Sequence, residues 1–168
     1  MKLGVGDEIV YRAYGIGRVV ERKPVSASSA STHETVVLAM VDGLTVTLPL
    51  DRALSELRPL ATKADLDRLR EALRADPVVS EGQWLSRRRD TMAKLVGGDA
   101  VGLAEIVCEA AERQRRLQEA GKGTQISAGE REVVVKARQL LADEIAQARG
   151  SSREDADSWI EDQLEHGR

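Results

Sequence analysis

The sequence predicts an α+β protein with two units, because the spacing of its apolar residues changes once along the chain. Residues 1–50 contain β-branched runs separated by turn residues, whereas apolar residues recur at helical spacing from about residue 62 onward. A length of 168 residues is enough for two small domains. We therefore expect a β module over residues 1–52 and a compact all-α domain of four to five helices over residues 62–166.

The β module is predicted to contain four short strands, with the sequences EIVYR (8–12), IGRVVER (16–22), TVVLAMV (35–41) and LTVTL (44–48). Asp42-Gly43, between the last two strands, suits the positive-φ turn of a tight hairpin. Pro49 then ends the ladder because proline has no N–H to donate. The polar, Ser-rich segment 24–34 is interpreted as a hairpin loop. Strands this short and this closely spaced predict a small barrel of the SH3 or Tudor kind.

Helix-capping residues mark the beginnings of the predicted helices. They are Thr62 with Asp65, Ser80 with Gln83, Asp99, and Ser127 with Glu130. The helix that Ser80 opens is expected to end at Gly97-Gly98. Its buried face is predicted to carry Leu85, Met92 and Val96.

Composition and charge exclude several classes of function. A net charge of −3 argues against a free-standing nucleic-acid binder, which usually has a basic excess. Cys108 is the only cysteine, and His33 and His166 lie far from it, so the sequence provides neither a nucleophile–base pair nor a zinc-ligand spacing. We expect no catalytic residue, metal or cofactor. The absence of an apolar run of about 20 residues and the strand-like beginning of the chain predict a cytoplasmic protein without membrane contact.

The stretch SEGQWLSRRRDTMAKL (80–95) has two interpretations, which differ in the role of Trp84. In the first, Trp84 is the fourth residue of its helix and packs on Val79 as a hydrophobic staple. In the second, Trp84 is an apolar wedge flanked by phosphate-binding cations, as in proteins that kink DNA at the minor groove. A fully buried indole would favour the first interpretation and an exposed edge the second. The candidate cations are Arg87, Arg88, Arg89 and Lys94.

Four segments together span nearly the whole chain: VGDEIVYRAYGIGRVV (5–20), LTVTLP (44–49), W…RRR…KL (84–95) and SAGEREVVVKARQLLADEI (127–145). Taken in this order, they resemble the CarD family of bacterial RNA-polymerase-binding transcription regulators. The β motif is also similar to the polymerase-interacting module of transcription-repair coupling factors. The resemblance implies a Tudor-like domain that docks on the polymerase β subunit by strand addition. It also implies a helical domain that reaches the upstream edge of the promoter bubble.

The resemblance implies roles for individual residues. Trp84 would wedge into the minor groove at the double-strand/single-strand fork and slow bubble collapse, while the neighbouring cations contact the DNA backbone. Thr47 and Val25 stand where many members of the family have a larger or basic polymerase-contacting residue. The residues to which we assign polymerase binding are Val25, Val36, Thr45, Thr47 and Pro49.

Two further expectations concern the partners. Tethering to polymerase would raise the effective concentration of a DNA contact that is weak by itself, and we expect the chain to act as a monomer. The alternative is a protein–protein adaptor that uses its β module on another partner and does not touch DNA.

Overall fold

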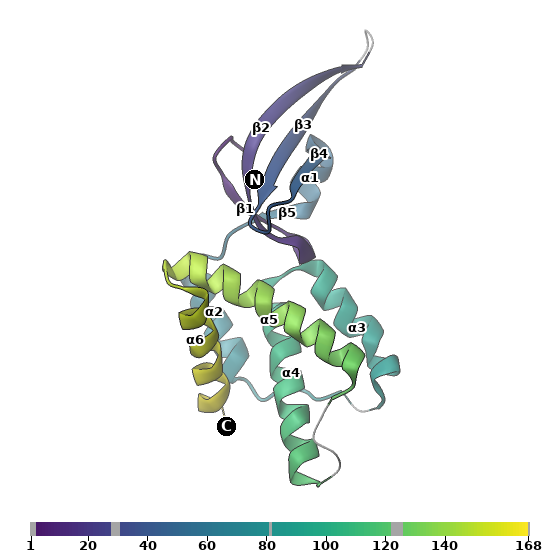
Figure 1. The fold of residues 1–168 in the computed structure, drawn as a ribbon, viewed down its shortest axis with the longest axis vertical. Coiled ribbons are helices and arrows are strands. Elements are labelled where there is room, and N and C mark those ends of the chain that lie inside the picture. The colour runs from purple at the N-terminus through teal and green to yellow at the C-terminus, as the bar shows by residue number, and fades with distance from the viewer. Residues whose placement is uncertain (1–2, 28–30, 81, 122–125, 168) are drawn as a thin grey trace. The chain divides into compact units, whose positions relative to one another are not determined.

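The computed structural model describes residues 3–27, 31–80, 82–121 and 126–167 (Figure 1), without the side chains of residues 25–27 and 31–33. The chain divides into two compact units, Met1–Leu60 and Ala61–Arg168. The first unit is built on an antiparallel sheet and the second on helices, which confirms the predicted α+β class.

The β unit is a five-stranded antiparallel sheet in the order β4-β3-β2-β1-β5 (Figure 1). Its elements are β1 (Glu8–Tyr11), the 3₁₀ helix η1 (Arg12–Tyr14), β2 (Gly15–Ala27), β3 (Ser31–Met40), β4 (Thr45–Pro49), α1 (Leu50–Glu56) and β5 (Leu57–Pro59). All four predicted strands are present. Alternate residues of these strands form the core, which includes Ile9, Val19, Val36, Leu38 and Leu48.

The β unit extends past residue 52 because of two elements that the sequence analysis missed. Pro49 ends β4 and is also the N-cap residue of α1. This helix buries Ala53, and the chain then returns as β5, where Leu57 pairs with Tyr11 of β1 and is buried. Because three residues are too few to show a strand period, β5 can be recognised only through its pairing.

The Ser-rich segment continues the sheet, so its interpretation as a loop was wrong for most of its length. The ladder between β2 and β3 runs on through the pairs Pro24↔Glu34, Val25↔His33, Ser26↔Thr32 and Ala27↔Ser31. Arg22 joins the two strands there, because its Nε and Nη2 donate to the two carboxylate oxygens of Glu34 at 2.6 Å each. These hydrogen bonds hold the pKa of Glu34 below its usual value. Residues 28–30 lie outside the described chain.

The predicted hairpin between β3 and β4 is present, with a different type of turn. Gly43 has a φ of 88°, but Asp42 does not share this conformation. The Gly43 N–H donates to the Met40 carbonyl at 3.0 Å, and the Met40 N–H donates to the Leu44 carbonyl at 2.8 Å. This is a three-residue turn with a glycine bulge rather than a two-residue turn. Its register fixes which backbone groups of β4 face β3.

The second unit contains, within the described residues, five helices: α2 (Lys63–Arg74), α3 (Trp84–Gly97), α4 (Ala100–Glu119), α5 (Ala128–Arg149) and α6 (Arg153–His166) (Figure 1). Their shared core includes Leu69 and Leu73 of α2, Leu103 and Val107 of α4, Leu141 and Ile145 of α5, and Ile160 of α6. The predicted caps at Thr62 and Asp99 are confirmed by hydrogen bonds from Asp65 N and Gly102 N. None of the described helices has the length and apolar content to cross a membrane.

Candidate nucleic-acid and partner interfaces

Helix α3 begins at Trp84, later than the sequence analysis predicted. Ser80 does not cap it, because the Ser80 N–H donates to Glu109 Oε1 at 3.0 Å and the Ser80 carbonyl accepts from Arg113 at 2.8 Å. Gly82 has a φ of 102°, which a right-handed helix cannot contain. Trp84 is therefore the first residue of the helix and not the fourth. The predicted capping box at Ser80 and the staple between Val79 and Trp84 were both wrong.

The predicted buried face of α3 was also wrong. Leu85 is 76% exposed and Val96 is 48% exposed, while Met92 is only partly buried against the core. The buried residues of the helix are Leu95 and Arg87. The sequence analysis placed apolar side chains inside and charged ones outside, and Arg87 departs from this rule because a carboxylate partner is buried with it.

Arg87 belongs to a buried network of charged side chains that joins three helices. Its two terminal nitrogens donate to the two carboxylate oxygens of Glu130 in α5, at 3.0 Å each. Its Nε donates to the Gly82 carbonyl at 3.2 Å. The Nε of Arg113 in α4 lies 3.2 Å from Glu130 Oε1, and Arg113 also donates to Glu109. Each nitrogen of the Arg87 guanidinium thus donates to a partner within the protein, and the side chain is buried rather than presented to a phosphate.

Glu130 was predicted to complete a capping box with Ser127, and only half of that box is formed. The Glu130 N–H donates to Ser127 Oγ at 3.3 Å, as in a capping box. The Glu130 carboxylate is turned to Arg87 and is almost completely buried. Sequence reasoning missed this role because the S-x-x-E spacing already had a local explanation.

The Trp84 indole is half-buried and is supported from two sides. The Arg87 Cζ atom lies 5.9 Å from the centroid of the ring, within the range of a cation–π contact. On the side of α5, a Cβ atom at Gly129 would lie 3.0 Å from the indole Nε1. An open depression of about 450 Å³ lies beside Trp84 and is lined by Gln83 and Leu117, among others. The indole is therefore braced and yet partly accessible, which differs from the fully buried staple.

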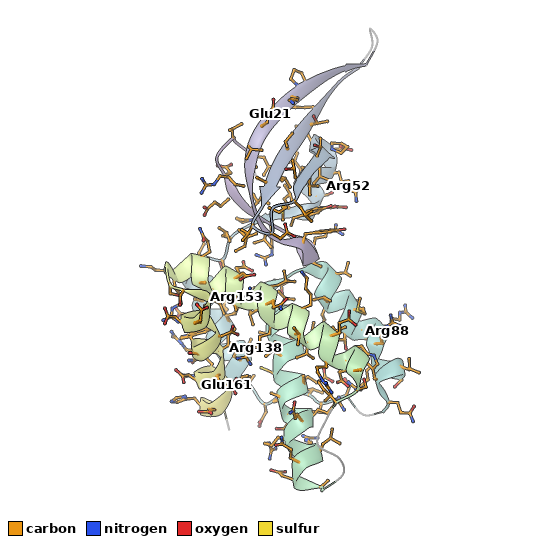
Figure 2. All side chains as sticks on the ribbon, viewed as in Figure 1. Glu21, Arg52, Arg88, Arg138, Arg153 and Glu161 are labelled. Atoms are coloured by element: carbon orange, nitrogen blue, oxygen red, sulfur yellow. The ribbon has the colours of Figure 1, made fainter. Side chains whose placement is uncertain are left out.

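The other candidate cations on α3 are at the surface. Arg88 and Arg89 are exposed and have no hydrogen bond or ion pair within the described part of the chain. Figure 2 shows Arg88 projecting outward from α3, away from the other helices of its unit. Lys94 is less exposed than these two arginines, and its Nζ pairs with Glu105 Oε2 at 2.8 Å. Arg88 is four residues after Trp84 and so lies on the same side of the helix as the partly exposed indole, whereas Arg89 lies further around the helix.

In the β unit, β4 is an edge strand that pairs, among the described strands, with β3 alone. The Met40 N–H donates to the Leu44 carbonyl at the start of the ladder, and bonded and non-bonded pairs alternate from there along antiparallel strands. Thr45 and Thr47 occupy the non-bonded positions opposite Ala39 and Val37. Their backbone N–H and carbonyl groups therefore point away from β3, toward the free edge. The side chains of Thr45, Thr47 and Pro49 are exposed as well.

The two remaining candidate polymerase contacts are placed differently. Val36 lies in β3, between β2 and β4, and its side chain is completely buried in the core of the β unit. It therefore supports the sheet and has no surface for a partner. Val25 is paired with His33 in the ladder of β2 and β3, and its side chain lies outside the described residues.

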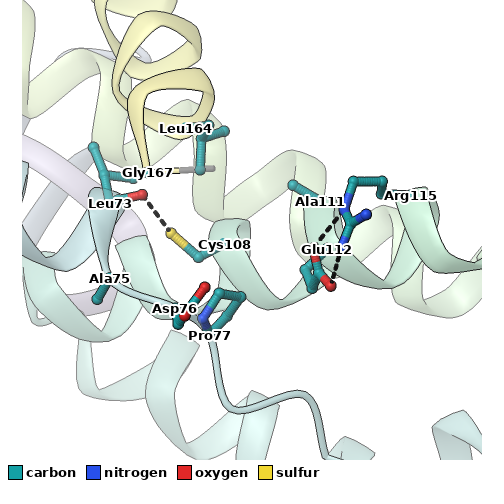
Figure 3. A pocket seen from close by; sticks show the side chains of 10 residues that line it. All are labelled: Leu73, Ala75, Asp76, Pro77, Cys108, Ala111, Glu112, Arg115, Leu164 and Gly167. Atoms are coloured by element: carbon teal, nitrogen blue, oxygen red, sulfur yellow. Dashed lines mark hydrogen bonds and ion pairs between the residues drawn. The ribbon is translucent and has the colours of Figure 1, made fainter.

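Cys108 is a buried structural thiol. Its Sγ donates to the Leu73 carbonyl at 3.4 Å, near the end of α2 (Figure 3). Burial, helped by the charge of Glu105, raises the pKa of this thiol to about 11. A pocket of about 410 Å³ lies beside it, where Glu112 pairs with Arg115. No group of three or more His, Cys, Asp or Glu side chains able to hold a metal occurs among the described residues.

Two protein-family models match the chain, one for each unit. Residues 3–61 match the CarD-like/TRCF RID domain, and residues 68–161 match the CarD C-terminal domain. Both are families of non-catalytic binding domains. The two matches follow each other in the order of the β unit and the helical unit, and the second alone spans more than half of the chain. The chain therefore belongs to the CarD family of RNA-polymerase-associated transcription regulators.

Proposed function

We infer that the protein binds the β subunit of RNA polymerase through its β unit and stabilises the promoter open complex through its helical unit. The observation that carries this proposal is the partly exposed Trp84, on a helix that also carries two exposed arginines without a partner among the described residues, in a chain that belongs to the CarD family. The protein acts as a monomer in this proposal. A polymerase partner also agrees with the cytoplasmic localisation expected from the sequence.

The polymerase half of the proposal rests on the free edge of β4. Thr45 and Thr47 direct backbone donors and acceptors outward, which is what an added strand from a partner requires. Pro49 has no N–H, so it limits the length over which a partner strand can pair. The opposite edge, β5, has three residues and ends in Pro59, which makes it a poorer template.

The DNA half of the proposal rests on Trp84, Arg88 and Arg89. An indole with accessible surface can enter a base step at the fork, and the two guanidinium groups can each neutralise a phosphate. Lys94 can join them only by giving up its pair with Glu105. Arg87 supports Trp84 and is not counted among the phosphate contacts. Two phosphate contacts on a chain of net charge −3 give weak binding, so the tether to polymerase is essential.

The experiment that tests the polymerase half is a pull-down of the β subunit with edge-strand variants of the full chain. Thr47→Pro removes an outward-facing N–H and no ladder bond to β3, so we expect β-subunit recovery to be lost. Thr47→Val is the matched control, because it changes the same side chain and keeps the N–H. Equal recovery by Thr47→Pro and the wild-type chain would contradict docking by strand addition.

The DNA half is tested in the recovered complex by protection of fork DNA. Protection at the upstream edge of the bubble is expected with the wild-type chain and should be lost with an Arg88→Gln, Arg89→Gln double variant. A complex that retains polymerase but protects no fork DNA in the wild-type form would favour the adaptor without DNA contact.

A further inference from the structure

We propose that helix α5 sets the pose of the Trp84 indole, with Gly129 and Glu130 as its positioning residues. This inference rests on the proposed role of Trp84 at the fork and adds residues from a different helix to it. A wedge must be held at a fixed angle to enter a base step, so the contacts that fix the indole determine how well it works.

The beginning of α3 supplies little of this support. Trp84 is the first residue of the helix, and the N-cap residue Gln83 makes no side-chain capping bond. Gly82, just before it, has a φ of 102° and lies outside the helix. Helix ends without caps fray, so a side chain at the first position is the least constrained by its own helix.

Gly129 allows the indole to lie directly against the backbone of α5. A Cβ atom at this position would lie 3.0 Å from Nε1 of Trp84 and 3.7 Å from its Cδ1. The 3.0 Å separation is tighter than ordinary van der Waals contact, so a side chain at 129 would require the indole to shift by a few tenths of an ångström. A glycine in the first turn of a helix otherwise costs stability relative to alanine. Its presence is explained by this contact.

Glu130 fixes the second support of the indole through Arg87. The Arg87 guanidinium near the ring of Trp84 is held by two 3.0 Å bonds to Glu130 and one bond to the Gly82 carbonyl. Glu130 is fixed in turn by Arg113 and by the Ser127 cap of α5. The orientation of Trp84 therefore depends on α5. Gly129 is part of this helix, and Arg87 is bonded to it through Glu130.

The first test uses Gly129→Ala, with Gly97→Ala as its matched control. Both replace a helical glycine, but a Cβ atom at Gly97 would meet nothing within 4 Å. Because alanine favours the helix, unfolding should not accompany Gly129→Ala, and thermal melting checks this. Acrylamide quenching of Trp84 is measured in a Trp159→Phe background, where Trp84 is the only tryptophan. Open-complex lifetime is measured with polymerase and promoter DNA.

We expect Gly129→Ala to change the quenching of Trp84 and to shorten the open-complex lifetime, by less than Trp84→Ala does. Gly97→Ala should change neither quantity. If Gly129→Ala leaves both the quenching and the lifetime at their wild-type values, the proposal is overturned.

The second test uses Glu130→Gln, with Asp157→Asn as control for loss of a carboxylate that pairs α5 with another helix. We expect Glu130→Gln to shorten the lifetime and to have no further effect in a Trp84→Ala background. An additional loss in that background would show that Glu130 acts independently of Trp84 and would count against the proposal. If Glu130→Gln does not fold, the result of the Gly129→Ala test alone decides whether the proposal holds.

Failure of this inference and failure of the proposed function give different results. If Trp84→Ala itself has the wild-type lifetime, the wedge role fails. The quenching of Trp84 in the free protein still decides whether Gly129 and Glu130 hold the indole.

Discussion

The buried pair of Arg87 and Glu130 makes a strong prediction about the stability of the helical unit. The two side chains are only 9% and 7% exposed and are joined by two bonds of 3.0 Å. Removing one partner of a buried pair costs about 3–5 kcal/mol, because a charge remains without compensation. In Arg87→Met the Glu130 carboxylate keeps Arg113 at 3.2 Å, so the loss should be about 3 kcal/mol, at the lower end of this range.

The reverse variant, Glu130→Met, should lose more stability than Arg87→Met. In Glu130→Met the buried guanidinium of Arg87 loses its carboxylate and keeps the Gly82 carbonyl and the Trp84 ring, while Arg113 keeps Glu109 and the Ser80 carbonyl. We expect a loss of about 5 kcal/mol, and a double Met variant should lose much less than the sum of the two single losses. The control is Arg138→Met, whose pairs with Asp157 and Glu161 are partly exposed and should be worth about 1 kcal/mol or less.

The assay is urea unfolding of the full chain followed by far-ultraviolet circular dichroism, which reports mainly on the helices. In thermal unfolding followed by the same signal, a loss of 3 kcal/mol in a unit of about 100 residues corresponds to a fall in melting temperature of about 12 °C or more. If Arg87→Met loses no more stability than Arg138→Met, the pair is not buried as described and Arg87 is again available for DNA.

Three further predictions follow from the charges and the thiol. The slope of log K against log salt for fork binding in the polymerase complex should decrease in magnitude by about 1 with Arg88→Gln and by about 1 more when Arg89→Gln is added. An unchanged slope in the double variant would exclude both residues as phosphate contacts. Because the Cys108 thiol has a pKa of about 11 and is buried, iodoacetamide should modify it only after unfolding in urea, as read by mass spectrometry. Modification of the folded chain at the rate of a free cysteine would contradict that burial. Arg115 and Arg116 lower the pKa of Glu112 in the folded chain to about 2 from 4.5, so the resulting stability is present above pH 4.5 and is lost as the pH falls toward 2. Acid unfolding should therefore be flatter in Glu112→Gln, and an acid-unfolding profile identical to the wild type would refute the contribution of Glu112.

The parts of the fold that could be predicted from the sequence are those with local signals. The strand runs, the caps at Thr62 and Asp99, and the glycine end of α3 at Gly98 are all encoded within a few residues. The strand β5 could not be predicted, because its three residues are defined by pairing with β1 from a distant part of the chain.

The surroundings of Trp84 show why the site was harder to predict from the sequence than the fold. Its sequence contains a capping-box spacing at Ser80, but tertiary bonds from Ser80 to Glu109 and Arg113 prevail over that local preference. Periodicity put Leu85 on the buried face, and Arg87 was a candidate phosphate-binding cation; in the structure Leu85 is exposed and Arg87 is buried. A buried arginine can be predicted only together with its partner, and Glu130 lies 43 residues further along the chain.

The most direct test of the proposed function is the lifetime of the promoter open complex with Trp84→Ala. The variant should still bind polymerase, because Trp84 lies in the helical unit and the proposed docking edge, β4, lies in the β unit. At equal occupancy of polymerase, we predict an open complex that decays faster than with the wild-type chain. An equal lifetime would contradict the role of Trp84 at the fork.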